Sequence, residues 1–149
     1  MGKIDFSKWV DEVINTSYTN GISVLLNTID QSIIKEIELN GVTLDEKVYI
    51  TDKRLWHGMR DSKPALIKLT IDELKSIYDI VNKPDMILLD KYDGRFLFIR
   101  NISEKLLIKL VFERNRKNSC LNYYTSSKID PTGLDIKTKH KILYNKKNI

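Results

Sequence analysis

The residues best suited to chemistry lie between positions 54 and 61, where three polar side chains recur at helical spacing. Arg54, His57 and Asp61 stand at positions i, i+3 and i+7, and Leu55 and Trp56 lie on the opposite, apolar side. An imidazole titrates near neutral pH and can exchange a proton with a sugar hydroxyl, and a guanidinium binds phosphate oxygens. This pattern favours metal-independent cleavage of RNA; the alternative is a half-exposed histidine that caps the end of a helix.

A second group of polar residues, Tyr123 to Ser127, supplies hydroxyls near the end of the chain. Strand alternation predicts that Tyr123 and Thr125 share one face, while Tyr124 and Ser126 share the other. We favour the Thr125 face, whose hydroxyl would orient a phosphate beside Arg54 and His57. The tyrosine rings would stack a splayed base, and ordinary strand packing is the alternative.

Other chemistry has weaker support in the sequence. His140 lies in a lysine-rich tail and is expected at the surface, and Cys120 is expected to be a small buried apolar residue. Pro84-Asp85 followed by Asp135 only faintly resembles a metal-nuclease signature. The sequence contains no HExxH motif and no glycine-rich phosphate loop, so we expect neither a metal nor a cofactor.

Length and composition place these residues in a globular chain. It has 149 residues, of which 42% are hydrophobic and 30% are charged, enough to form a core. No apolar run approaches the roughly 20 residues that a membrane span needs. The N-terminus lacks an apolar signal segment, so we expect a cytoplasmic protein that does not act at a membrane.

The charge is divided unevenly along the chain. Residues 1–46 carry a net charge of −5, whereas residues 47–149 carry +10. We therefore expect an acidic helical N-terminal arm (1–46) and a basic domain (47–149) with a lysine-rich tail (136–149). A basic body favours a polyanionic partner. The acidic arm would dock a partner or cover the basic groove in cis.

Hydrophobic periodicity and capping signals predict the elements of the first half. Helices are expected around residues 9–14 and over 23–39, with a strand at 21–26 as the alternative for the start of the second. A strand at 48–50 leads into a helix that begins after Thr51 and ends near residue 60 or 61. Thr70 and Glu73 form a capping-box pattern that opens a further helix, which Pro84 ends.

From residue 86 the period changes to two. Strands are expected at 86–90, 95–102, 106–114 and 120–127, and Asp93-Gly94 marks a hairpin turn. Together they predict a four-stranded antiparallel meander with the helices covering one face, an α+β fold.

The order of these pieces resembles the phage-associated nuclease branch of the barnase, EndoU, colicin and RelE superfamily, whose fold is abbreviated BECR. The likeness lies in the segment 48–57, which runs from a strand into a basic helix with a histidine, in Pro84-Asp85, and in Tyr124-Thr125 on the closing strand. It covers residues 47–128. The resemblance implies a small metal-independent ribonuclease in which the 2′-hydroxyl attacks the phosphate and leaves a cyclic phosphate.

The resemblance also implies roles for individual residues. His57 matches the early catalytic histidine of the family, and Arg54, or Lys53 beside it, matches the basic residue one turn earlier. Thr125, or Ser126, matches the late hydroxyl. The sequence departs from EndoU-like members, which use a second histidine, so the general acid is unassigned. The RNA-binding candidates, from charge, stacking and position, are Lys53, Arg60, Lys63, Arg100, Tyr124 and Ser126.

The leading hypothesis is an endoribonuclease that acts on tRNA or another RNA as the toxin of a phage or mobile element. An antitoxin or immunity protein is the partner that such a toxin would have. The alternative is a non-catalytic module that binds nucleic acid or protein and gives His57 no chemical role.

Overall fold

The computed structural model describes residues 2–17, 19–59 and 67–148. The first part contains α1 (Lys3–Thr16), β1 (Ser23–Thr28), α2 (Gln31–Leu39), β2 (Lys47–Thr51) and α3 (Asp52–His57). The second part contains α4 (Ile71–Lys75), α5 (Ile77–Asn82), β3 (Met86–Asp90), β4 (Phe96–Ser103), β5 (Leu106–Arg114), β6 (Leu121–Ile129) and β7 (His140–Asn145). Short 3-10 turns follow β6 at Pro131–Gly133 and β7 at Lys146–Asn148.

The α+β class is as predicted, but the predicted four-stranded antiparallel meander is wrong. The seven strands form one mixed sheet in the order β1-β2-β6-β5-β4-β3-β7. Strands β3 to β6 do pair antiparallel in succession, whereas β2 pairs with β6 in parallel through Val48 and Tyr49. The additional strands join through contacts between distant segments, which local periodicity does not report.

Two local predictions for the first half also change. Residues 23–28 form β1, the strand alternative, and a separate helix begins after Asp30, whose carboxylate accepts a hydrogen bond from the Ser32 N–H. The capping box at Thr70 and Glu73 is confirmed, but the helix that it opens is interrupted at Ser76 and continues as α5.

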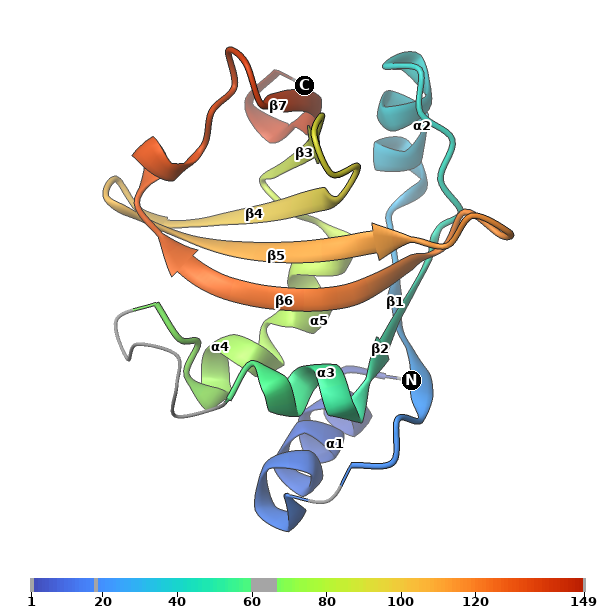
Figure 1. Cartoon of the computed structure of the whole chain (residues 1–149), viewed down its shortest axis with the longest axis vertical. Helices are drawn as coiled ribbons and strands as arrows, with labels where there is room; N and C mark the ends of the chain where they lie inside the picture. Colours follow the sequence, from blue (N-terminus) through green and yellow to red (C-terminus); the bar gives the residue numbers. More distant parts are fainter. Residues whose placement is uncertain (1, 18, 60–66, 149) are drawn as a thin grey trace.

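All the helices pack into one hydrophobic core on one side of the sheet. Phe98 and Phe112 lie at its centre with ring centroids 4.8 Å apart, and the Tyr123 ring meets Phe112 edge-on at 6.0 Å. Figure 1 shows α1, α3, α4 and α5 on the same side of β4–β6. Each fully buried phenylalanine contributes about 1.5–3 kcal/mol relative to an exposed one.

The residues before position 47 belong to this same core. Phe6 and Val10 of α1, Leu26 of β1 and Ile37 of α2 are all fully buried in it. α1 lies against α3, α4 and α5, and α2 lies against β7. The buried apolar residues of this segment belong to the main core, and none of those described joins the smaller apolar cluster on the opposite face of the sheet.

The opposite side of the sheet, which we call the helix-free face, carries a smaller apolar cluster. Its buried residues are Leu88, Leu97, Ile99, Leu107 and Val111. Among the described residues, no α-helix contributes to this cluster. Polar side chains on this same face of the strands are therefore next to apolar residues and are not covered by a helix.

Candidate functional site

Helix α3 is fixed at its start by two polar side chains. The Thr51 hydroxyl accepts a hydrogen bond from the Arg54 N–H at 3.1 Å. The buried Asp52 carboxylate accepts hydrogen bonds from the N–H groups of Asn20 and Gly21 at 3.1 and 3.0 Å. These bonds tie the segment before β1 to the helix that carries the predicted catalytic residues, and so set its position against the sheet.

The helix ends earlier than predicted. It stops at His57, and Gly58 follows as its C-terminal cap, so the expected extension to residue 60 or 61 is wrong. Leu55 is buried in the main core, while Arg54 and Lys53 are exposed. Asp61, the third member of the helical pattern, lies outside the described residues.

Arg54 reaches the strand that carries the predicted hydroxyl. Its guanidinium lies 4.4 Å from the centroid of the Tyr124 ring, and the guanidinium of Arg95 lies 4.0 Å from the same ring. A cation over an aromatic face is stabilised by about 0.5–2 kcal/mol, depending on how far it is desolvated. Three segments that are far apart in the sequence therefore place two positive charges on one ring, immediately before Thr125.

A β-bulge changes which side chains of β6 share a face. Val111 is paired with Thr125 but Phe112 with Tyr123, so the register shifts at Tyr124. Tyr123 packs in the main core, whereas Tyr124 packs against the cluster of the helix-free face. The predicted alternation is therefore wrong: the bulge places Tyr124 and Thr125 together on the helix-free face and Tyr123 with Ser126 on the covered face.

Ser126 and Tyr123 form a buried pair under the helices. Ser126 is 2% exposed, and its hydroxyl oxygen lies 2.6 Å from the Tyr123 hydroxyl. Complete burial raises the pKa of Tyr123 to about 12, although the bond from Ser126 acts in the opposite direction. Of the two hydroxyl candidates on β6, Thr125 is thus the half-buried one on the helix-free face.

His57 is half-buried at the end of α3, and that end meets β6. A Cβ atom added to the neighbouring Gly58 would lie 3.6 Å from the Tyr123 hydroxyl oxygen. Tyr123 packs in the main core, so this end of α3 meets β6 from the covered face, whereas Tyr124 and Thr125 lie on the helix-free face. The structure therefore brings Arg54 to the residue before Thr125, and brings the helix end that carries His57 to the same strand.

The remaining candidates are Arg60, Lys63 and Arg100. Arg60 and Lys63 lie outside the described residues. Arg100 follows the fully buried Phe98 by two positions on β4 and so lies on the covered face, where its guanidinium donates to the Lys83 carbonyl at 2.8 Å. Arg100 also lies 3.7 Å from the Asp85 carboxylate. It is therefore on the opposite side of the sheet from Arg95.

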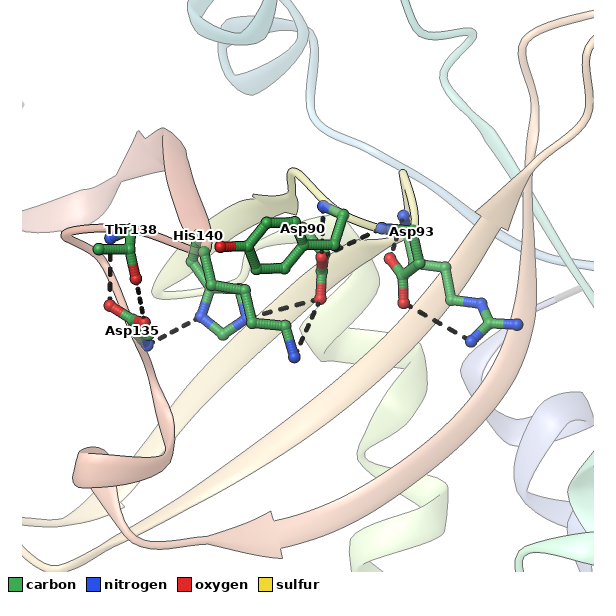
Figure 2. A network of polar contacts seen from close by, with 8 residues as sticks. Asp90, Asp93, Asp135, Thr138 and His140 are labelled. Atoms are coloured by element: carbon green, nitrogen blue, oxygen red, sulfur yellow. Dashed lines mark hydrogen bonds and ion pairs between the residues drawn. The ribbon is translucent and has the colours of Figure 1, made fainter.

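A polar network occupies the β3–β7 end of the helix-free face (Figure 2). The buried Asp90 carboxylate accepts hydrogen bonds from the N–H groups of Tyr92 and Asp93 and lies 3.5 Å from the Lys139 ammonium. Burial acts to raise the pKa of Asp90, but these N–H groups and Lys139 hold it below its ordinary value. A negative charge is therefore retained inside this network.

His140 is part of this network and is buried, so the prediction that it lies at the surface is wrong. It is 4% exposed; its Nδ1 atom accepts a hydrogen bond from the Asp135 N–H at 2.9 Å, and its Nε2 atom lies 3.8 Å from Asp90. This bonding assigns the ring proton to Nε2. Burial lowers the pKa of His140, against the opposing effect of Asp90, so the imidazole connects two segments in its neutral form.

The site contains residues that the sequence analysis missed. Arg95 and Lys109 share the helix-free face with Leu97 and Val111, because each is two residues away from one of them on the same strand segment. The alternation of strand residues could have predicted this placement. What the sequence lacked was the bulge that brings Tyr124 to the same face. The thiol of Cys120 is buried, and burial raises its pKa, which fits the expected apolar role.

Three further observations concern the described residues as a whole. A cavity of about 880 Å³ opens between Met86, Leu107 and Leu134 at the other end of the helix-free face, and none of the described candidate residues lines it. Within the described ranges, no three histidine, cysteine or acidic side chains are grouped to hold a metal ion. In the same ranges, no helix has the length and apolar character needed to cross a bilayer.

In comparisons with known proteins, no family model, curated protein or solved structure matches the chain.

Proposed function

We propose that this chain is a metal-independent endoribonuclease that acts on RNA in the cytoplasm, with its site where α3 meets β6. The proposal is supported by one observation above all. Arg54, from the same short helix as His57, and Arg95, from the β3–β4 hairpin, both lie on the ring of Tyr124, next to Thr125. Two guanidiniums beside a hydroxyl on an uncovered sheet face suit a phosphodiester.

The chemistry follows from the types of these side chains. His57 takes the proton of a ribose 2′-hydroxyl, whose oxygen attacks the adjacent phosphorus. The bond between phosphorus and the 5′-oxygen breaks, and this oxygen takes up a proton from water as it leaves. Arg54 binds the phosphate oxygens whose negative charge grows in the transition state, and Thr125 orients the same phosphate. The products are a 2′,3′-cyclic phosphate and a 5′-hydroxyl.

The resemblance to the phage-associated BECR nucleases gives this site a biological setting in the proposal. Such a ribonuclease would act as a toxin of a phage or mobile element, on tRNA or another RNA, and would be held inactive by an antitoxin or immunity protein. The charge supports RNA as the substrate, because residues 47–149 carry a net charge of +10.

The test is cleavage of total RNA by the full chain in the presence of EDTA. We expect wild type to cut RNA and His57→Ala to lose at least about 100-fold in rate, the usual contribution of a general base. Arg54→Ala should lose a similar factor. Arg116→Ala is the matched control, because Arg116 is exposed on the turn between β5 and β6, away from α3.

Two further readouts separate the proposed chemistry from a contaminating nuclease. Mass spectrometry should find cyclic phosphate ends on the products, and an RNA with 2′-O-methyl groups should resist cleavage. If wild type leaves RNA intact at high concentration, as His57→Ala does, the ribonuclease proposal fails. Tight RNA binding without cleavage would instead make the chain a binding module.

A further inference from the structure

Lys109 is a charged residue that neither the fold nor the proposed chemistry explains. It lies in the middle of β5, between Leu107 and Val111, and is paired across the sheet with Ile99 and Ser127. The cluster of the helix-free face includes the buried residues Leu107, Val111 and Ile99, so the Lys109 side chain is surrounded by apolar side chains where it leaves the strand. A lysine in such a place loses part of its hydration and needs a compensating partner.

No such partner is present within the described residues. The Lys109 ammonium makes no hydrogen bond or ion pair there, in contrast to Lys139, which lies 3.5 Å from Asp90. Burial lowers the pKa of Lys109, and the positive charge of Lys139 lowers it further, while Asp90 acts more weakly in the opposite direction. The ammonium groups of Lys109 and Lys139 thus repel each other, and within the described residues only Lys139 has a carboxylate partner.

The neighbours of Lys109 indicate what the missing partner is. Ser127 lies directly opposite on β6, and Thr125 lies one pair further along the same face. Beyond Thr125 stands the Tyr124 ring with its two guanidiniums. Hydroxyls next to an unpaired cation suit an anion with several acceptor oxygens, and the row of positive groups extends along β5 and β6 as a nucleic-acid backbone would require.

We infer that Lys109, with the hydroxyls of Thr125 and Ser127 and with Lys139 nearby, forms a subsite for a second backbone phosphate of single-stranded RNA, next to the phosphate held at Arg54. This inference deepens the proposed function, since it takes RNA as the substrate. It adds a contact that positions the strand without taking part in proton transfer. Arg95 lies on the same Tyr124 ring as Arg54 and would border the phosphate held there.

The experiment uses a fluorescent 2′-O-methyl RNA oligonucleotide, which binds but cannot be cut by 2′-hydroxyl attack. Anisotropy titrations at several salt concentrations compare wild type, Lys109→Met and Lys109→Arg. We expect Lys109→Met to lose about tenfold in affinity at low salt. Its slope of log affinity against log salt should be shallower by about 0.7. Lys109→Arg keeps the charge and should retain most of the binding.

Two controls distinguish a phosphate contact from a general effect of charge or folding. Lys35→Met removes one charge from the exposed side of α2, away from this face, and should change affinity little. Lys109→Met should melt at a higher temperature than wild type, because an unpaired ammonium is removed from apolar surroundings. A structural lysine would lower the melting temperature when it is replaced.

The subsite inference is overturned if Lys109→Met binds as tightly as wild type with the same salt slope, or if Lys35→Met loses as much. Cleavage of unmodified RNA is measured in parallel. If RNA is cut but affinity does not depend on Lys109, the subsite fails alone. If affinity depends on Lys109 but nothing is cut, the ribonuclease proposal fails and the subsite stands.

Discussion

The two faces of the sheet differ in what they contact, although the same strands contribute to both. On the covered face, β5 contributes Ile108, Leu110 and Phe112 to a core that every helix packs against. On the helix-free face, the same strand contributes Leu107 and Val111 with Lys109 between them. A face with no helix above it can hold charged groups close to the backbone, because solvent or a ligand can still reach them. We infer that stability resides on the first face and binding on the second.

The largest expected effect is on the free energy of unfolding, when a buried leucine on each face is shortened to alanine. Leu110 and Leu107 are both buried on β5, 0% and 4% exposed, but they point to opposite sides. We expect Leu110→Ala to lower the free energy of unfolding by about 4–5 kcal/mol and Leu107→Ala by about 2 kcal/mol, since the thinner layer can close around the gap. Denaturant midpoints with unchanged m-values measure both. Equal losses would contradict the division between the faces.

A second effect distinguishes the neighbouring tyrosines of β6. The pKa of Tyr123 is raised to about 12 in the folded state, whereas an unfolded tyrosine ionises near 10. The unfolded chain therefore loses its proton first, and stability falls as pH rises from about 10 to 12. The loss is roughly 1 kcal/mol by pH 11. Unfolding at pH 9 and 11 should show this loss in wild type and a smaller one in Tyr123→Phe.

The matched control for that measurement is Tyr124→Phe, on the helix-free face. It keeps Tyr123 and should therefore keep the alkaline loss. Should Tyr123→Phe lose as much stability at pH 11 as wild type does, the buried hydroxyl pair is not the group that titrates.

Local signals predicted much of the fold, and long-range contacts account for the rest. The capping box at Thr70 and Glu73 and strands β3 to β6 follow from residues within a few positions of each other, so the sequence alone shows them. β1 and the parallel pairing of β2 with β6 depend on segments far apart in the chain. Leu26 and Ile29 fit a helical stripe equally well, and only tertiary pairing selects the strand.

The candidate site divides in the same way. The basic helix beginning after Thr51 was predictable from its cap, and with it the placement of Arg54 and His57. The meeting of Arg54 and Arg95 at Tyr124 was not, because one extra residue in β6 reverses the face on which the following side chains lie. The burial of His140 could not be predicted for a related reason, since Asp90 becomes its neighbour only when β7 pairs with β3.

The acidic segment shows the consequence for experimental design. Deleting residues 1–46 to expose a basic groove would remove β1 from the sheet and Phe6 and Leu26 from the main core. Loss of RNA binding by such a truncation would report unfolding. Point substitutions on the helix-free face avoid this problem, because they leave the covered core intact.

The smallest effect that we predict is a loss of stability at acid pH, caused by His140 on the helix-free face. Burial lowers the pKa of His140 in the folded state, while Asp90 partly offsets this. Below the unfolded value of about 6.5, the unfolded chain binds the proton more readily, so stability should fall as pH drops from 7.5 to 5.5. His140→Gln offers an acceptor to the Asp135 N–H and a donor toward Asp90 without titrating. Thermal melts across this range should therefore show a smaller fall for His140→Gln than for wild type, and parallel curves would exclude His140 as the cause.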